Sequence, residues 1–438
     1  MNIYLIAPDL RSLGGFEGQL ATLAVGLAEA GHKPFVFIRE PVDPSHPYWQ
    51  RIKEKGIYTY SGAGWLNRLV AWQQRLPNFL LTILTIPLAI LALLDAVVRR
   101  RSWSRSLAGG KGVLRKRFGR LAEFDIPIWA LKRNVAAVAS KSPPDIVDIQ
   151  HSMIPHALHF AKQQNWPLIY TEYGAPDWAL SSVWLGMKEI VNEADFVIGR
   201  AAASITGLQD LCCLSAQMPT AIIPNAVTAG PRTGDATNLA LPTTQQPVMI
   251  TAIGRLSPEK GTPYLLEAFK HLVAEGLPIY LVLAGDGPLR EKLEHQIYSW
   301  QLTNYVKITG RFDTLEPIIK TTHIVAHPTL NDGRSVSVLE AMAWGRPVVG
   351  SAIGGVPELI EHDVNGFLVP PADVAALSKA LKRLVVDETL RCQMGKLARE
   401  RFLAQSFSAK EMVQETISVY HHVLKANKTD QPYVFPKN

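Results

Sequence analysis

The sequence contains very little cysteine. Three cysteines occur among its 438 residues, and two of them, Cys212 and Cys213, are neighbours of a kind that rarely pair with each other. A disulfide framework is therefore excluded, and a reducing compartment is expected. No Cys-x-x-Cys pair or cysteine–histidine cluster is present, so a structural zinc site is not expected either.

A basic stretch ahead of the first apolar segment is also missing. Met1-Asn2-Ile3 runs directly into the apolar residues 3–7, so we expect no secretory signal and a cytoplasmic protein. The chain has no Asp-x-Asp motif after a predicted strand, the kind of carboxylate pair that would hold a divalent metal. We therefore expect no catalytic metal and no other cofactor.

Acidic residues are absent from residues 99–120, where nine cations are concentrated. The formal net charge of the chain is +7, and without these nine it would be −2. The basic character is therefore local, whereas a nucleic-acid-binding protein normally spreads its cations over a wider face of a recognisable binding fold. The cations are Arg99, Arg100, Arg101, Arg105, Lys111, Arg115, Lys116, Arg117 and Arg120.

The sequence does contain two successive sets of short apolar runs that alternate with helical patterns. Continuous apolar runs are typical of parallel strands that are buried on both faces. A stretch rich in Thr, Pro, Gly and Asn separates the two sets. The runs of the first set are residues 3–7, 34–38, 57–60, 145–150, 168–170, 196–198 and 221–223, and those of the second are 248–253, 279–284, 306–309, 324–327 and 347–350.

Two βα arrays joined by a linker predict two Rossmann-like α/β domains that face each other across a cleft. A chain of this length is also too long for one compact core. We place the N-terminal domain at residues 1–225, the linker at 226–247 and the C-terminal domain at 248–407. A helix at 408–426 is predicted to cross back to the N-terminal domain, and 427–438 form a tail.

Residues 61–131 interrupt the first array with an insertion far longer than an ordinary βα connection, and such insertions are usually functional. Within it, residues 79–94 carry no charge but are too few to span a bilayer as a helix. A single span would also put two parts of one sheet on opposite sides of a membrane. Three readings stay open: an interfacial or re-entrant helix, a buried helix, and a dimer interface.

We favour attachment of residues 79–120 to an anionic membrane surface. Trp65, Trp72 and Trp103 flank the apolar run as an aromatic belt would. Each neighbouring cation would add roughly 1 kcal/mol of attraction to anionic headgroups. A helix packed inside the protein would have no need of these cations.

Two cations and two carboxylates stand out in the second array. Arg255 and Lys260 follow the strand predicted at 248–253, at the sheet edge where parallel sheets bind ligands and where a helix begins. They could hold a diphosphate, or they could be solvated surface charges. Asp332 and Glu340 could accept hydrogen bonds from sugar hydroxyls, although Asp332 could also simply complement the dipole of the following helix.

These residues belong to a longer pattern that resembles the retaining GT-B glycosyltransferases of family 4, the glycosyl transferases group 1. The resemblance covers residues 247–376 and extends more thinly into the first domain. The motifs that carry it are Gly254-Arg255…Glu259-Lys260-Gly261, Ala284-Gly285-Asp286-Gly287-Pro288, Asp332…Glu340, Leu339-Glu340-Ala341-Met342-Ala343…Gly345-Arg346-Pro347-Val348-Val349, Gly354-Gly355-Val356-Pro357-Glu358, Pro8…Gly14-Gly15-Phe16-Glu17 and Ile223-Pro224-Asn225-Ala226-Val227.

The resemblance implies a donor-binding role for five residues. Arg255 and Lys260 would bind the donor diphosphate, and Glu340 would bind the ribose hydroxyls of the nucleotide. Gly15 and Gly333 would let the backbone approach the donor closely.

The resemblance also implies a catalytic group made of Asp332, Glu340 and a histidine from the first domain. The family usually has Glu at the position of Asp332, so the carboxylate that would hold the transferred sugar is one methylene shorter here. His151 is the candidate histidine, with its register open by one residue against Gln150.

His156 is the second choice for that histidine, and a packed or capping histidine is the alternative. Glu172 and Tyr173, after the next predicted strand, are weaker candidates for contact with the acceptor.

Together these assignments predict a retaining hexosyltransferase that moves a sugar from a UDP-, GDP- or ADP-linked donor to a lipid-linked or membrane-associated glycan. The leaving phosphate would take the proton of the attacking hydroxyl, which explains why no paired acid and nucleophile stand out. The enzyme would be peripheral on the cytoplasmic face of the membrane and would not bind nucleic acid. Two other readings stay open: another GT-B enzyme such as a nucleotide-sugar epimerase, and a catalytically weak GT-B partner protein at the membrane.

Overall fold

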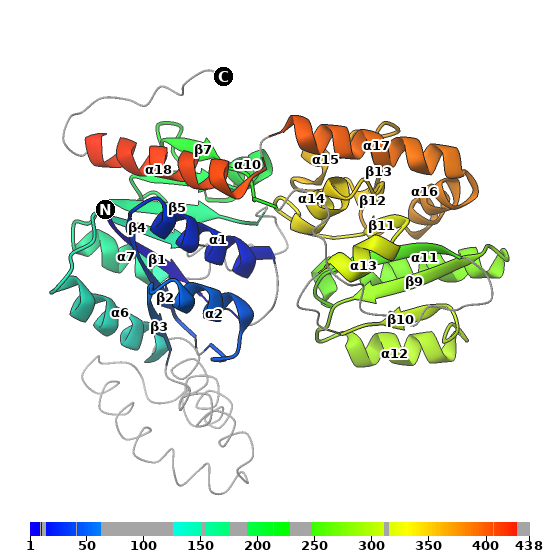
Figure 1. The fold of residues 1–438 in the computed structure, drawn as a ribbon, viewed down its shortest axis with the longest axis horizontal. Helices are drawn as coiled ribbons and strands as arrows, with labels where there is room; N and C mark the ends of the chain where they lie inside the picture. Colours follow the sequence, from blue (N-terminus) through cyan, green and yellow to red (C-terminus); the bar gives the residue numbers. More distant parts are fainter. Residues whose placement is uncertain are drawn as a thin grey trace, which may run out of the picture.

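The computed structural model describes residues 1–8, 10, 15–40, 42–62, 126–150, 155–174, 191–212, 214–227, 247–310, 315–405 and 407–426. These residues form two α/β domains that lie side by side, each built on one parallel sheet with helices on both of its faces (Figure 1). The predicted fold class, two Rossmann-like α/β domains, is therefore confirmed.

The N-terminal sheet is made of short strands, and those at its centre are mostly apolar and buried. They are β1 (Asn2–Ala7), β2 (Lys33–Ile38), β3 (Tyr58–Ser61), β4 (Ile146–Gln150), β5 (Leu168–Glu172), β6 (Phe196–Gly199) and β7 (Thr220–Ile222). Their order across the sheet is β3-β2-β1-β4-β5-β6-β7, and all neighbours are parallel. The order reverses between β1 and β4, which is where doubly wound sheets open a crevice for ligands.

Helices cover this sheet because their apolar residues recur on one face. In α1 (Gly15–Glu29), Leu20, Leu23 and Leu27 are fully buried at a spacing of three and four residues. The helix stops before Gly31, which has a φ of 82°, and the amide of His32 donates to the carbonyl of Leu27 at 3.0 Å. The other helices are α2 (Pro47–Glu54), α6 (Ile126–Ala139), α7 (Pro155–Gln163) and α10 (Ala202–Cys212).

The C-terminal sheet repeats the same topology. Its strands are β8 (Val248–Ile253), β9 (Ile279–Ala284), β10 (Val306–Ile308), β11 (Ile324–His327), β12 (Val348–Ser351) and β13 (Gly366–Val369). The order is β10-β9-β8-β11-β12-β13, again parallel throughout, so the crevice is expected between β8 and β11. The sequence pattern had not indicated β13, because four residues after a turn are too few to show a strand period.

Among the described residues, side chains cap the N-termini of three helices in the C-terminal domain, two of them α16 and α17. The side chain of Asp373 accepts the amide of Ala376 at 2.9 Å, and Asp387 accepts that of Leu390 at 2.8 Å. The helical segments are the short 3-10 turn η4 (Pro258–Lys260), α11 (Thr262–Ala274), α12 (Arg290–Ser299), α13 (Glu316–Thr321), α14 (Val336–Ala343), α15 (Val356–Leu359), α16 (Val374–Val386) and α17 (Glu388–Ala404).

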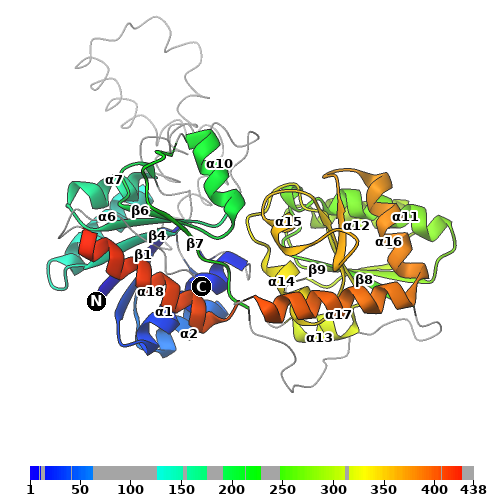
Figure 2. The same ribbon diagram turned by 90° about the horizontal axis from the view of Figure 1, so that it is seen from above.

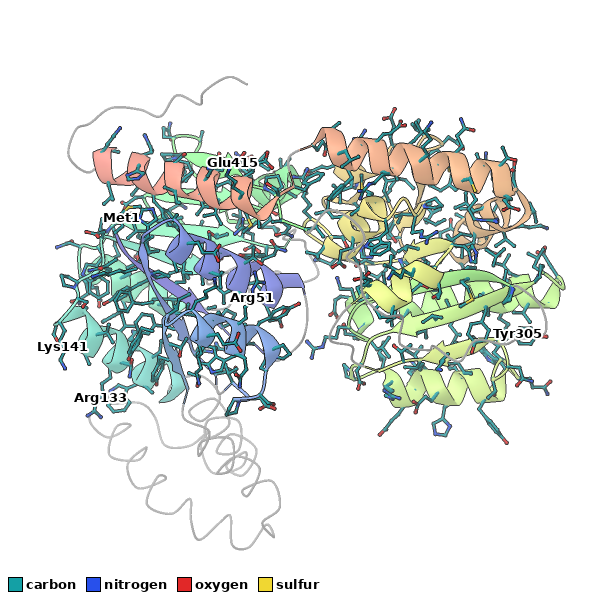
Figure 3. The ribbon with its side chains drawn as sticks, in the orientation of Figure 1. Met1, Arg51, Arg133, Lys141, Tyr305 and Glu415 are labelled. Carbon is teal, nitrogen blue, oxygen red and sulfur yellow. The ribbon has the colours of Figure 1, made fainter. Side chains whose placement is uncertain are left out.

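The last helix, α18 (Ala409–Ala426), leaves the C-terminal domain and lies on the N-terminal one, alongside α1 (Figure 2). Glu415, labelled in Figure 3, marks its position above the N-terminal sheet. Val413 packs so tightly on α1 that a Cβ added to Gly26 would lie 2.4 Å from its Cγ2. Where the chain crosses between domains, the amide of Val227 donates to the carbonyl of Phe407 at 2.9 Å.

The insertion predicted at 61–131 lies largely outside the described residues, since 63–125 are among those not described. Within the described ranges, none of the helices has the length and apolar character that crossing a membrane would require.

Candidate donor-binding site

The candidate site lies where β8 and β11 run side by side, at the switch point of the C-terminal sheet. The loop after β8 carries Arg255 and Lys260, and the loop after β11 carries Asp332. Gly261 lets these loops touch: it has a φ of 64°, and a Cβ there would lie 1.9 Å from the carbonyl oxygen of Pro328. Only glycine fits this close approach.

Two hydrogen bonds hold the loops together. The carbonyl oxygen of Glu259 accepts the amide of Leu330 at 2.7 Å and the hydroxyl of Thr329 at 3.0 Å. These bonds satisfy polar groups that would otherwise be buried without partners. The loops therefore form a fixed platform for the charged side chains that they carry.

The carboxylate of Asp332 is the centre of this platform. Its Oδ2 lies 3.1 Å from Nζ of Lys260 and 2.9 Å from Nε2 of His327, the last residue of β11. Burial opposes ionisation of Asp332, but the charge of Lys260 and the hydrogen bond from His327 outweigh it, so the pKa of Asp332 lies well below its ordinary value. Asp332 is therefore ionised, and one of its two hydrogen-bond donors is Lys260, the lysine predicted to bind phosphate.

Glu340 lies one turn into α14 and is in the opposite situation. Burial raises the pKa of its carboxyl to about 7. Among the described residues, no hydrogen bond or ion pair is found for this carboxylate. Its negative charge also helps to raise the pKa of Tyr48, on α2 of the other domain, after the larger effect of burial. Glu340 thus faces the N-terminal domain and remains available to a ligand.

Arg255 differs from Lys260 in its exposure. Its side chain is exposed to solvent, whereas that of Lys260 is 30% exposed and held by Asp332. The structure therefore brings Lys260 and Asp332 into contact, places Glu340 in the helix that follows their loops, and leaves the side chain of Arg255 exposed.

The two domains meet at Gly333. A Cβ on Gly333 would lie 1.9 Å from the carbonyl oxygen of Tyr173, so the loop touches the backbone of the N-terminal domain directly. The carbonyl oxygen of Gly333 accepts the amide of Gly355 at 2.7 Å, which fixes the loop from the other side. Gly15 takes part as well, since a Cβ there would lie 2.9 Å from Val336 at the start of α14.

An ion pair that sequence reasoning missed reinforces this contact. Nη2 of Arg334 lies 3.1 Å from Oε2 of Glu358, and the other oxygen of Glu358 accepts the amide of Ala203 in α10 at 3.1 Å. Asn225 adds a bond of 2.7 Å from its side-chain amide to the carbonyl of Arg334. Arg334 and Glu358 thus link the donor loop to two segments of the N-terminal domain.

The candidates from the N-terminal domain are placed differently. His151 lies outside the described residues, and His156 lies in α7 with a side chain that is not described. Glu172 is fully buried and accepts bonds from the hydroxyl of Tyr170 and from the amide of Gly174, the latter at 2.7 Å. This carboxylate is used inside the domain and does not line its surface.

Tyr173 is also buried, 8% exposed, although its backbone reaches Gly333. Its hydroxyl donates to Gln150 at 2.6 Å and accepts from Arg200 at 2.9 Å. Arg200 also stacks on the ring at 4.7 Å from its centroid. The side chain of Tyr173 therefore organises the region behind the cleft and does not face it.

Sequence reasoning also missed His327 and Tyr48. His327 ends a buried strand at the predicted crevice, which is the signal that had singled out His151, so it could have been found in the same way. Tyr48 gave no such signal, because its relation to Glu340 depends on how the domains pack. No cluster of three His, Cys, Asp or Glu side chains of the kind that holds a metal occurs among the described residues.

Part of this chain is similar to known protein families. Residues 240–401 match the model of the family described as glycosyl transferases group 1. The amylovoran biosynthesis glycosyltransferase AmsK of Erwinia amylovora is 36% identical over 152 residues, 33% of this chain and 37% of that protein. An Escherichia coli UDP-Gal:alpha-D-GlcNAc-diphosphoundecaprenol alpha-1,3-galactosyltransferase is 26% identical over 211 residues, 46% of this chain and 54% of that protein.

These sequence matches are partial, spanning 37% to 59% of the lengths of such curated relatives. Similarity in structure extends further. The crystal structure of Anabaena HepE in complex with UDP and glucose covers 95% of this chain and 99% of that protein, with a TM-score of 0.68 at 18% identity. The family match lies in the C-terminal domain, and the fold match extends across both domains.

Proposed function

We propose that the protein is a retaining glycosyltransferase of family 4, of the hexosyltransferase type, that uses a nucleoside-diphosphate sugar as donor. The observation that carries the proposal is the contact of Lys260 with Asp332 at the switch point between β8 and β11, with the buried carboxyl of Glu340 in the helix that follows. A cation suits a diphosphate, and carboxylates suit the hydroxyls of a sugar and a ribose.

Lys260 and Arg255 would hold the donor diphosphate. Lys260 is paired with Asp332, so the phosphates would draw its ammonium group partly away from that carboxylate. Asp332 would keep the hydrogen bond from His327 and could then accept hydroxyl protons of the transferred sugar. Solved structures of similar fold are complexes with UDP, or with UDP and glucose, which supports a nucleotide-sugar donor.

Glu340 would accept hydrogen bonds from the ribose hydroxyls. Its carboxyl has no partner among the described residues. Because its pKa is raised to about 7, both the neutral and the ionised form are populated near neutral pH. Two hydroxyl donors would favour the ionised form. Gly333 and Gly15 would allow backbone amides of both domains to approach the donor phosphates.

The reaction would proceed with retention of configuration at the anomeric carbon. The bond from that carbon to the phosphate oxygen breaks, and the acceptor oxygen bonds to the same face. The acceptor proton passes to the leaving phosphate, whose charge the cations stabilise. His151 would complete the site from the N-terminal domain, and no step requires a metal.

The acceptor would be a lipid-linked or membrane-associated glycan. Relatives named for amylovoran biosynthesis and for a diphosphoundecaprenol-linked substrate support this class. Residues 79–120, with their apolar run and nine cations, would hold the enzyme on the cytoplasmic face of an anionic membrane.

The transfer itself is tested by incubating the protein and isolated membranes with UDP-, GDP- and ADP-linked sugars. Nucleoside diphosphate should be released from one donor class, and release should be lost in Lys260→Ala. Isomerised donor in place of transferred sugar would instead identify an epimerase. If no donor is turned over and Asp332→Glu restores turnover, the protein is a catalytically weak partner.

The membrane proposal has its own test. The chain should float with anionic liposomes, and deletion of residues 79–120 should abolish flotation. Flotation that survives the deletion would rule out this segment as the anchor. Adding a chelator to the transfer assay tests the proposal that no metal is needed.

A further inference from the structure

His327 connects Asp332 to the start of α14. On one side its Nε2 lies 2.9 Å from Oδ2 of Asp332. On the other its Nδ1 lies 3.5 Å from the hydroxyl of Ser337. The ring is 5% exposed, so these partners, and not water, decide its orientation.

The donors and acceptors in this arrangement can be ordered. Asp332 is ionised and can only accept, so Nε2 of His327 carries a hydrogen. In the neutral ring Nδ1 then accepts from Ser337. The hydroxyl of Ser337 is 3.0 Å from that of Ser335, the N-cap residue of α14, which accepts the amide of Val338 at 3.4 Å. A continuous hydrogen-bonded chain thus joins the helix cap to the carboxylate.

Oδ1 of Asp332 takes no part in this chain. The contacts found for Asp332 among the described residues, from Lys260 and His327, all go to Oδ2. A carboxylate held by one oxygen presents the other in a defined direction. Since Asp332 reaches one methylene less far than glutamate, its direction matters more than it would for the longer side chain.

We propose that His327 is a positioning residue for sugar transfer: with Ser337 it fixes the carboxylate of Asp332 so that Oδ1 meets the hydroxyls of the transferred sugar. The inference rests on the proposed function, because it assigns Asp332 to that sugar. It also explains how the ion pair with Lys260 can open. When Lys260 turns toward the donor diphosphate, His327 retains Asp332 in place.

The kinetic test compares three variants. His327→Ala removes the donor to Oδ2, and we expect kcat to fall by about 10- to 100-fold with the donor KM and the affinity for the nucleoside diphosphate unchanged. His327→Gln carries an amide in place of Nε2–H and should recover most of kcat. His323→Ala is the matched control: it removes a histidine just before the same strand that bonds the amide of Met249 and not Asp332.

A double-mutant cycle shows whether His327 acts through Asp332. In the background of Asp332→Asn, the further change His327→Ala should have almost no effect on residual kcat. Equal losses in both backgrounds would overturn the proposal. A rise in donor KM with kcat unchanged, or failure of His327→Gln to recover activity when the variant folds, would also overturn it.

A spectroscopic test separates this inference from the proposed function, since it needs no turnover. In protein labelled with ¹⁵N in its histidines, the signal lost in His327→Gln should be that of an Nε2–H tautomer, and it should shift in Asp332→Asn. Seeing this signature in a protein that transfers no sugar would retain the hydrogen-bonded chain and reject the function. An active protein without it would reject the positioning role alone.

Discussion

The two domains have the same strand order but use their polar residues differently. In the C-terminal domain, Lys260, Asp332 and Glu340 stand at the sheet edge with side chains that a ligand can reach. In the N-terminal domain, the polar residues at the corresponding edge, including Gln150 and Glu172, are fully buried and bonded to each other or to their neighbours. The C-terminal domain is therefore organised around partly buried charges at the sheet edge, and the N-terminal domain around an internal network.

Removing a single charge should therefore change ligand binding at the candidate site in the C-terminal domain. Substitutions in the described part of the N-terminal domain should instead change mainly the free energy of unfolding. The following predictions test this contrast, beginning with the largest expected effect.

Lys260→Ala should cause the greatest loss. Its ammonium group is the partly buried cation beside Asp332, so removing it also leaves that carboxylate with one partner fewer. We expect affinity for the nucleoside diphosphate to fall by roughly 100-fold, measured by calorimetry. Arg255→Ala, at an exposed position, is the comparison and should cost about 10-fold or less. A larger loss of affinity in Arg255→Ala than in Lys260→Ala would mean that Arg255, and not Lys260, is the main phosphate-binding residue.

Gly333→Ala should separate the domains. The new methyl group would lie 1.9 Å from the carbonyl oxygen of Tyr173. The atoms that it would meet are backbone atoms of the N-terminal domain, which cannot turn aside as a flexible side chain could. We expect transfer to fall by about 10- to 100-fold, with a larger radius of gyration in small-angle scattering.

Gly395→Ala provides the control within one domain, because its methyl group would lie 2.3 Å from the carbonyl oxygen of Gly345. This variant should lower the melting temperature and leave the domain spacing unchanged. If Gly333→Ala keeps both spacing and activity, the contact at Tyr173 is not required.

Glu340→Gln should change how stability depends on pH. The pKa of Glu340 is raised from 4.5 to about 7, so the folded protein holds a proton that the unfolded chain has lost between these values. Stability therefore falls as the pH rises from about 4.5 to about 7, by about 2–3 kcal/mol at most. The glutamine variant should lose this slope and gain stability at pH 8, as measured by urea unfolding, while its affinity for nucleoside diphosphates falls. Glu267→Gln, on the exposed face of α11, is the control and should keep the slope.

Tyr420→Phe should have the smallest effect on function. It removes the 2.7 Å hydrogen bond from α18 to Asp148, a fully buried carboxyl whose pKa is raised by burial. We expect a loss of about 1–3 kcal/mol in the free energy of unfolding, with unchanged affinity for nucleoside diphosphates. Tyr298→Phe, 79% exposed, should change neither. A weakened donor site in Tyr420→Phe would show that the two halves are coupled through this network.

Much of the fold was predictable because continuous apolar runs are local features. The strands at 248–253, 279–284 and 324–327 were predicted with their observed ends, and the helix predicted at 408–426 is found at Ala409–Ala426. Strand β13 escaped because it is only four residues long. The charges that form the donor platform were also predictable, since all follow strands at one edge of a parallel sheet.

The pairings within the site were not predictable. Lys260 and Asp332 are 72 residues apart, and nothing local shows that the two side chains contact each other. Glu172 is the opposite case, a residue whose sequence position predicted a site role that its side-chain contacts do not support. It follows a strand exactly as a site residue would, but the tyrosine two residues earlier and the amide two residues later occupy its carboxylate.

The return of α18 has a consequence for how the protein can be divided and how it can move. The N-terminal domain is assembled from two stretches of chain, so the C-terminal domain is in effect inserted into it. A fragment ending at residue 225 would expose the groove filled by Val413 and leave Asp148 without its tyrosine. The two crossing segments are bonded to each other at Val227 and Phe407, so a rotation of one domain against the other would have to carry both passages of the chain together.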